Sequence, residues 1–162
     1  MTAAAAPRRS SAEQRRLDDA LTLMWEQRIR FNQLLGLKVL SLQPDGVSAR
    51  LDMRADLVGH YSYGRLHGGA ISATLDALGG LALMVALGEK HADESADQVI
   101  HRFGRMGTID LRVDFLRQGI GSRFTAHAAV TRLGGRIGST QMRLLDEHEL
   151  LIATGAASFV VS

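Results

Sequence analysis

The sequence has 162 residues, of which 46% are hydrophobic and 22% are charged, and it contains no cysteine. This length is typical of one domain that buries a sizeable core. The lack of cysteine excludes a disulfide framework and a thiolate metal site, and it is typical of a reducing compartment. A net charge of +2 and only 5% aromatic residues leave no basic stripe interleaved with aromatic side chains, so we expect no nucleic-acid partner.

The first ten residues are rich in alanine and then contain Pro7, Arg8 and Arg9. This composition predicts a disordered tail over residues 1–10. No apolar segment of the signal-peptide type follows these arginines, so we expect no membrane anchor and a cytoplasmic location. Residues 11–162 contain no internal repeat and no linker, and are expected to form one domain.

Residues 11–35 have the apolar spacing of an amphipathic helix. Leu17 and Leu21 are among the residues on its apolar side, and Gly36 is a stop signal. Trp25, the single tryptophan of the sequence, is assigned to the core or to an interface. We therefore expect one N-terminal helix packed outside the rest of the domain.

A β-hairpin is predicted next, because two alternating segments, 37–42 and 47–53, flank the turn sequence at residues 43–46. Residues 54–66 have the composition of a loop that leads into a long apolar segment. Residues 89–105, which follow that segment, are polar and of mixed charge. This composition predicts a mobile loop beside whatever the apolar segment binds.

The C-terminal part predicts four further strands, at residues 108–116, 122–131, 136–145 and 150–161. Short connections between consecutive strands favour antiparallel neighbours. The predicted fold class is therefore α+β, with an antiparallel sheet of about six strands, one long buried helix and the extra N-terminal helix.

The apolar segment from Ala70 to Gly88 carries one ionisable residue, Asp76, which predicts a buried helix. Ser72, Thr74 and Asp76 in its first half argue against a membrane span. A carboxylate in such a helix costs free energy unless another group pairs with it or uses it. Asp76 is therefore the main candidate functional residue, and an Asp that caps or bridges a structural element is the alternative.

Helical spacing gives this segment two different faces. The bulky face contains Ile71, Leu75, Leu78, Ala82 and Val85. The other face is mostly small and contains Gly69, Ser72, Ala73, Asp76, Gly79, Gly80 and Leu83. We expect the bulky face to pack against large neighbours, and the small face to admit a ligand or a second subunit close to the carboxylate.

His67, Gly68 and Gly69 stand where the chain enters this helix. The first N–H groups of a helix have no intrahelical acceptor, and the helix dipole favours negative charge there. The Gly68 N–H is therefore a candidate donor to an oxyanion. Asp76 lies seven residues after Gly69, about 10 Å along the axis. Either a substrate spans this distance, or the carboxylate works with an N–H group of a second chain.

His-Gly-Gly followed by an acid nine residues after the histidine resembles the hotdog-fold acyl-CoA thioesterases of the PaaI type. The segment Gly107–Leu116, GTIDLRVDFL, is similar to the strand after the helix in that family, and the likeness covers residues 37–161. The resemblance implies a hotdog fold, in which the sheet wraps around the long helix. It also implies hydrolysis of a fatty or aromatic acyl-CoA to free acid and CoA, with no metal and no redox cofactor.

The resemblance implies a role for each residue of the motif. Asp76 would act as general base or as nucleophile, and the Gly68 N–H would polarise the thioester carbonyl. His67 would order the helix start and contact the thioester. Thr108 would hold the attacking water and would come from a partner subunit, because the strand alternation places it on the same side as Asp110, away from the apolar set.

Further residues are assigned to substrate binding. Relatives often carry Asn or Gln six residues before the motif histidine, where this chain has Tyr61, so Tyr61 or Ser62 is the expected substitute. Gly69 is assigned to the same site, and Arg132 and Arg136 are candidate ligands of the CoA phosphates. The expected lining of the acyl pocket is Leu57, Val58, Tyr61, Tyr63, Leu83 and residues 89–106.

A site shared between chains implies a homodimer or homotetramer with active sites at the interface. The alternative function is a non-catalytic acyl-CoA binding or sensing module of the same fold, with a structural Asp76. A hydratase or dehydratase would need an arrangement of His and acid that the sequence lacks. His91, His101, His127 and His148 do not have the spacing of metal ligands.

Overall fold

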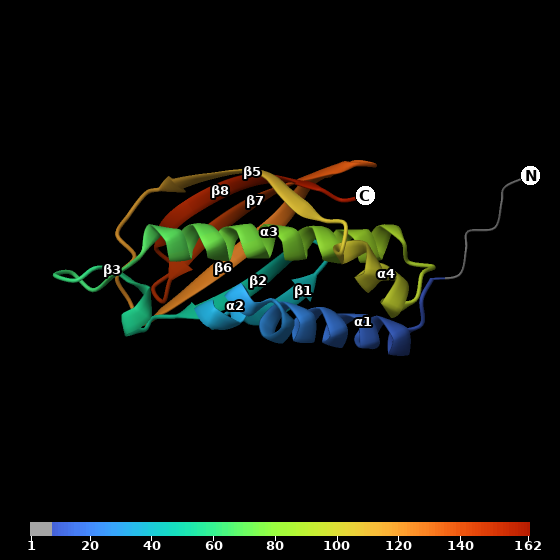
Figure 1. Ribbon diagram of the computed structural model, residues 1–162, viewed down its shortest axis with the longest axis horizontal. Coiled ribbons are helices and arrows are strands. Elements are labelled where there is room, and N and C mark those ends of the chain that lie inside the picture. The colour runs from blue at the N-terminus through green and yellow to red at the C-terminus, as the bar shows by residue number, and fades with distance from the viewer. Residues whose placement is uncertain (1–7) are drawn as a thin grey trace, which may run out of the picture.

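The computed structural model describes residues 8–162, and in it one long helix lies across the face of a curved antiparallel sheet (Figure 1). The sheet has six strands in the order β1-β2-β6-β7-β8-β5. Their bounds in this order are β1 Lys38–Gln43, β2 Gly46–Asp52, β6 Arg123–Leu133, β7 Ile137–Asp146, β8 Leu151–Val160 and β5 Gly107–Phe115. The predicted α+β class, the strand number and the antiparallel pairing are confirmed.

The connection predicted as a loop over residues 54–66 contains secondary structure. It forms the 3₁₀ turn η2 (Ala55–Leu57) and a small hairpin of β3 (Val58–His60) and β4 (Arg65–Leu66). The hairpin extends beyond the N-terminal end of the long helix, at the left of Figure 1. These strands are too short for an alternating pattern to be visible in the sequence.

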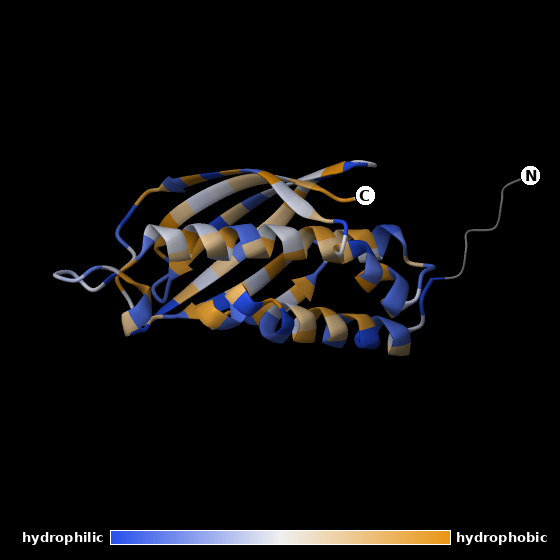
Figure 2. Ribbon diagram, in the orientation of Figure 1, coloured by the Kyte–Doolittle hydropathy of each residue, from blue (hydrophilic) through white to orange (hydrophobic). Residues whose placement is uncertain are grey.

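The long helix α3 (Gly68–Lys90) is the core element that the sequence predicts. Its bulky stripe is buried in full, with exposed fractions of 8% or less. The helix is long and apolar enough to cross a membrane, but 67% of its apolar window is buried inside the domain. Figure 2 shows apolar residues along α3, on the strands and on the N-terminal helix, and the buried core cluster includes residues of all three. α3 is therefore the core helix of the domain.

Two residues of the small face of α3, Gly79 and Leu83, are buried inside the domain, and the other five are half-buried or exposed. Packing of a second subunit against these five residues stays a prediction. A Cβ atom added at Gly79 would lie 2.9 Å from Thr140 Oγ1 and 3.1 Å from a ring carbon of Phe159, on β7 and β8. Gly79 thus lets the helix sit directly on the sheet. One residue further, Gly80 lines a cavity beside the N-terminal helices.

The N-terminal helix is interrupted, where the sequence predicts one continuous helix. It consists of α1 (Ser11–Leu23), one π-helical segment η1 (Met24–Arg28) and α2 (Arg30–Leu35). Ile29 between them has an extended backbone. Tertiary contacts accompany the break, because Trp25 Nε1 donates a hydrogen bond to Ala77 O at 3.1 Å and Asn32 Nδ2 donates one to Trp25 O at 3.0 Å. Trp25 is 1% exposed, so its assignment to the core is confirmed.

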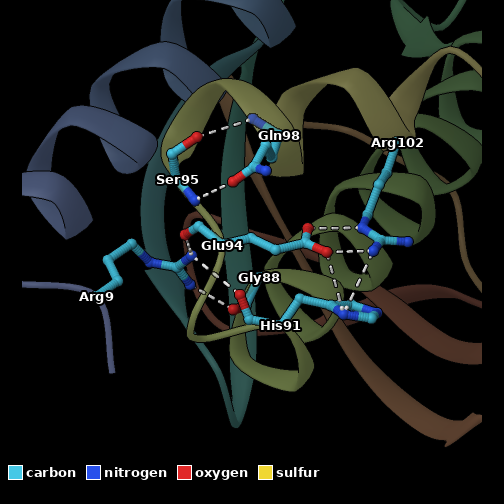
Figure 3. A network of polar contacts seen from close by, with 7 residues as sticks. All are labelled: Arg9, Gly88, His91, Glu94, Ser95, Gln98 and Arg102. Atoms are coloured by element: carbon cyan, nitrogen blue, oxygen red, sulfur yellow. Dashed lines mark hydrogen bonds and ion pairs between the residues drawn. The ribbon is translucent and has the colours of Figure 1, made fainter. Parts of the chain in front are cut away.

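The segment predicted as a mobile loop, residues 89–105, contains the helix α4 (Ala96–Phe103), so that prediction is wrong. A capping box starts the helix, in which the Ser95 and Gln98 side chains each bind the other's backbone N–H (Figure 3). Val99 then packs into the core. The helix was not predicted because the segment is mostly polar and only one narrow side of α4 is apolar.

Polar contacts fasten α4 to the C-terminal end of α3 (Figure 3). The Arg9 guanidinium donates hydrogen bonds to the backbone oxygens of Gly88, His91 and Glu94, and so caps the end of α3. Arg102 pairs with the Glu94 carboxylate, with Arg102 Nε 2.9 Å from Glu94 Oε2. Residues 1–7 of the predicted tail lie outside the described residues, whereas Arg9 is bound to the domain, so the ordered chain begins before residue 11.

This network predicts a pH-dependent contribution to stability. The hydrogen bond from Arg102 holds the pKa of Glu94 below its usual value. A lowered carboxyl pKa stabilises the fold above the usual pKa, and the stabilisation is lost as the pH falls through the lowered value. We expect Glu94→Gln to lower stability at pH 7 by about 1 kcal/mol, a Tm shift of about 2–4 °C.

Thermal melts of wild type and Glu94→Gln between pH 7 and pH 3 measure this contribution. The two melting temperatures should converge as the pH falls from the usual carboxyl pKa through the lowered one. Asp19→Asn, which removes an exposed acid of α1, is the matched control, and its Tm should differ from that of wild type by the same amount at every pH. A constant gap between wild type and Glu94→Gln over the whole range would contradict the assignment.

Candidate active site

The Asp76 side chain, half-buried two turns into α3, is bound by a hydroxyl of β5. Thr108 Oγ1 donates a hydrogen bond to Asp76 Oδ1 at 2.9 Å. The Thr108 hydroxyl therefore meets the carboxylate of its own chain, and its contact with a partner subunit stays a prediction. A register shift between Thr108 and Asp110 in the pairing of β5 with β8 breaks the strict alternation on which that prediction depended.

Asp76 and Thr108 open into a cavity of about 260 Å³. Most of its lining is apolar and comes from α3, from the N-terminal helices and from the connection between α4 and β5. The lining residues are Trp25, Ile29, Phe31, Asn32, Ala73, Asp76, Ala77, Gly80, Phe103, Met106, Gly107, Thr108 and Phe159. A carboxylate with one fixed hydrogen bond in such a cavity can take a proton from a bound water or attack a bound carbonyl.

A second hollow, of about 470 Å³, lies at the N-terminal end of α3. It is lined by Gly59, Arg65, Leu66, His67, Gly68, Ile71, Phe115, Leu116, Arg117, Gln118 and Gly119. Within residues 8–162 no acceptor binds the Gly68 N–H. This donor stands at the positive end of the helix dipole beside two arginines, which suits a developing negative charge.

His67 is the N-cap of α3, and its ring Nδ1 accepts a hydrogen bond from the Gly69 N–H at 2.8 Å. The neutral ring consequently carries its proton on Nε2. This contact orders the helix start and occupies the Gly69 N–H, so Gly68 supplies the available donor. The backbone of β3 also packs closely against His67, since a Cβ added at Gly59 would lie 2.6 Å from His67 Cα. Sequence analysis did not identify Gly59 or Phe115 as part of this end.

Several predicted site residues lie elsewhere in the single chain. Tyr61 and Ser62 occupy the tip of the β3–β4 hairpin, where Tyr61 is 93% exposed and stacks on His60. Arg132 and Arg136 are exposed at the β6–β7 connection. None of these four residues lines the cavity or the hollow, so their roles in substrate binding stay predictions.

The cavity at Asp76 differs from the predicted acyl pocket. Of the expected lining, only the segment 89–106 contributes, through Phe103 and Met106. Leu83 is instead fully buried, and its side chain packs directly against Gly138 of β7. Four of the missed residues come from η1, α2 and the break between them, where the sequence shows only the pattern of a packed helix. Within residues 8–162, no group of three or more His, Cys, Asp or Glu side chains could hold a metal ion.

Comparisons with known proteins identify the family of the chain. The thioesterase superfamily profile matches residues 63–153, which include the motif, α3 and most of the sheet. The chain is 35% identical over 147 residues to the medium/long-chain acyl-CoA thioesterase YigI of Salmonella typhimurium, over 89% of this chain and 95% of that protein. The protein of the same name from Escherichia coli K12 is 34% identical over the same shares.

Solved structures share the whole architecture, including the N-terminal helices. A Shewanella oneidensis protein related to the thioesterase superfamily has a TM-score of 0.87 at 32% identity, over 95% of this chain and 100% of that one. A structure from Syntrophus aciditrophicus has a TM-score of 0.82 at 29% identity, over 94% and 100%. The PaaI type within the family stays a prediction. The chain belongs to the thioesterase superfamily, and it is a thioester hydrolase with the hotdog fold.

Proposed function

We propose that the protein hydrolyses medium- or long-chain acyl-CoA thioesters to the free acid and CoA. The observation that carries this proposal is the Asp76 carboxylate, held by the Thr108 hydroxyl at the edge of an apolar cavity. A fatty acyl chain needs apolar surroundings, and its thioester carbonyl needs a base or nucleophile next to it. The name of the Salmonella relative supports the same substrate class.

Two chemical routes use this carboxylate. As a general base, Asp76 takes a proton from water, the hydroxide adds to the thioester carbonyl, and the C–S bond breaks. The departing CoA thiolate then takes the proton from Asp76, which restores the carboxylate. As a nucleophile, it displaces CoA thiolate to form an acyl anhydride, which water then hydrolyses to the acid and the free carboxylate. In both routes the Gly68 N–H stabilises the negative charge on the carbonyl oxygen.

The proposed site contains groups from two chains. Gly68 and Asp76 line separate hollows of one chain and lie eight residues apart on α3, about 12 Å along the axis. One carbonyl group does not bridge that distance. β5 is an edge strand with the exposed apolar side chains Ile109 and Phe115, and pairing such an edge with a second copy removes unpaired backbone groups. We therefore propose a homodimer, or a homotetramer built as a dimer of dimers, in which Asp76 faces the Gly68 N–H of the other chain.

An assay of CoA release tests the proposed function. Purified protein is incubated with acyl-CoAs of four to sixteen carbons and with benzoyl-CoA, and released thiol is trapped with a chromogenic thiol reagent. We expect turnover of the medium and long chains. Saturable binding of acyl-CoA with no release of CoA would instead identify a binding or sensing module of the same fold. Binding to Arg132 and Arg136 and a cytoplasmic location stay separate predictions.

A further inference from the structure

The wall of the Asp76 cavity contains four residues of η1, α2 and the break between them. Trp25, Ile29, Phe31 and Asn32 all line it, opposite Ala73, Ala77 and Gly80 of α3. The small residues of α3 leave space, and the larger residues of the N-terminal segment determine how much of that space stays open. This segment lies before the region matched by the family profile, which starts at residue 63.

Hydrogen bonds fix the position of this wall relative to the carboxylate. Trp25 Nε1 binds the carbonyl oxygen of Ala77, the residue after Asp76, and Asn32 Nδ2 binds the carbonyl oxygen of Trp25. Both side chains are at least 97% buried. Ile29 and Phe31 take no part in these bonds. They present aliphatic and aromatic surface to the cavity, with Phe31 56% exposed at its edge.

We propose that this cavity receives the acyl chain of the substrate, and that Ile29 and Phe31 determine the chain length that the enzyme prefers. The proposal rests on the proposed hydrolysis at Asp76. The lining suits hydrocarbon, because its polar side chains are Asp76, Thr108 and Asn32, and each of these already has a hydrogen bond. A polar acyl group would find few free partners there, whereas each buried methylene of a fatty chain gains affinity.

Chain-length profiles of three variants at two wall residues test the proposal. Ile29→Ala and Phe31→Ala enlarge the cavity, and we expect the acyl-CoA with the highest kcat/KM to be a longer one than in wild type. For each additional methylene that the cavity accommodates, kcat/KM should rise by about fourfold. Ile29→Trp should reverse the trend and reduce turnover of the longest chains. Leu34→Ala, on the same helix and 63% exposed outside the cavity, is the matched control and should keep the wild-type profile.

Trp25 provides a second measurement that does not depend on turnover. It is the single tryptophan of the sequence and it lines the cavity. In an Asp76→Asn variant, decanoyl-CoA should therefore change the tryptophan emission in a saturable way, whereas CoA alone should leave it unchanged. Ile29→Trp is not used in this measurement, because it adds a second indole.

Two outcomes overturn the proposal while leaving hydrolysis intact. One is an active wild type whose chain-length profile is the same in Ile29→Ala, Phe31→Ala, Ile29→Trp and Leu34→Ala. The other is tight binding of decanoyl-CoA, measured by calorimetry, with no change in Trp25 emission. An inactive wild type on every acyl-CoA would instead contradict the proposed function itself, and the two failures are thereby distinguished.

Discussion

Replacing Asp76 with asparagine is expected to lower kcat for acyl-CoA hydrolysis by at least about a hundredfold, with a melting temperature close to that of wild type. Asparagine keeps the size of the side chain and an oxygen that accepts the Thr108 hydrogen bond, but it neither takes a proton nor attacks a carbonyl. The half-buried position beside a cavity tolerates this isosteric change. The measurement is a steady-state assay of CoA release next to a thermal melt.

Asp19→Asn, an exposed acid on α1, is the control for loss of one negative charge and should retain wild-type kcat. Thr108→Val gives a graded comparison, since it removes the hydroxyl that orients Asp76 but leaves the carboxylate. Its kcat should lie between those of wild type and Asp76→Asn. Full activity of Asp76→Asn in a folded protein would remove the carboxylate from the mechanism.

Gly68→Pro is expected to lower kcat by about a hundredfold or more through the loss of a single N–H group. Gly68 is the first residue of α3, and this is the helical position where proline is well tolerated. The preceding residue, His67, already has the extended backbone that proline requires, with ψ of 134°. The substitution thus removes the proposed oxyanion donor and leaves the helix start intact.

Gly68→Ala is the matched control, because it adds the same Cβ and keeps the N–H. That Cβ would lie 3.3 Å from the ring of Phe115, a contact that a small ring movement relieves. Gly68→Ala should therefore be far more active than Gly68→Pro. Equal losses in both variants would attribute the effect to crowding at Phe115 and would exclude an oxyanion role for the Gly68 N–H.

Mixing the two inactive variants tests whether a site is shared between chains. In a hybrid dimer of Asp76→Asn and Gly68→Pro, the Gly68→Pro chain still supplies Asp76, and the Asp76→Asn chain still supplies the Gly68 N–H. A shared arrangement therefore makes one of two sites intact, and random exchange restores about a quarter of wild-type activity. If each chain used its own Gly68 and Asp76, the hybrid would have no intact site and would stay inactive.

The core of the fold follows from local patterns in the sequence. Alternation predicts β5 and β6, and turn signals with short connections predict β7 and β8, all to within one or two residues. The long apolar segment predicts α3, because a helix that is apolar on most sides must be buried. The interruption at Ile29 has no such local signal. It accompanies hydrogen bonds of Trp25 and Asn32 that join residues far apart in the chain, and periodicity contains no information about those partners.

Some residues of the candidate site could likewise be predicted from the sequence, and others could not. Asp76 and Gly68 stand out in the sequence because an acid in an apolar helix and glycine at a helix start are chemically unusual. The position of Thr108 could not be predicted, since one bulge in β5 changes which side its hydroxyl faces. The cavity wall was also missed, because side chains such as Ile29 and Phe31 look the same in a sequence whether they fill a core or border an open space.

The close contact between α3 and the sheet at Gly79 limits how the enzyme can respond to substrates of different size. A shift of the helix along its axis would bring bulkier neighbours of Gly79 onto Thr140 and Phe159, where there is no room even for a methyl group. This contact therefore holds Asp76 at one position along the sheet. We expect substrates of different size to be accommodated by displacement of the peripheral helices, while the proposed reacting group stays stationary.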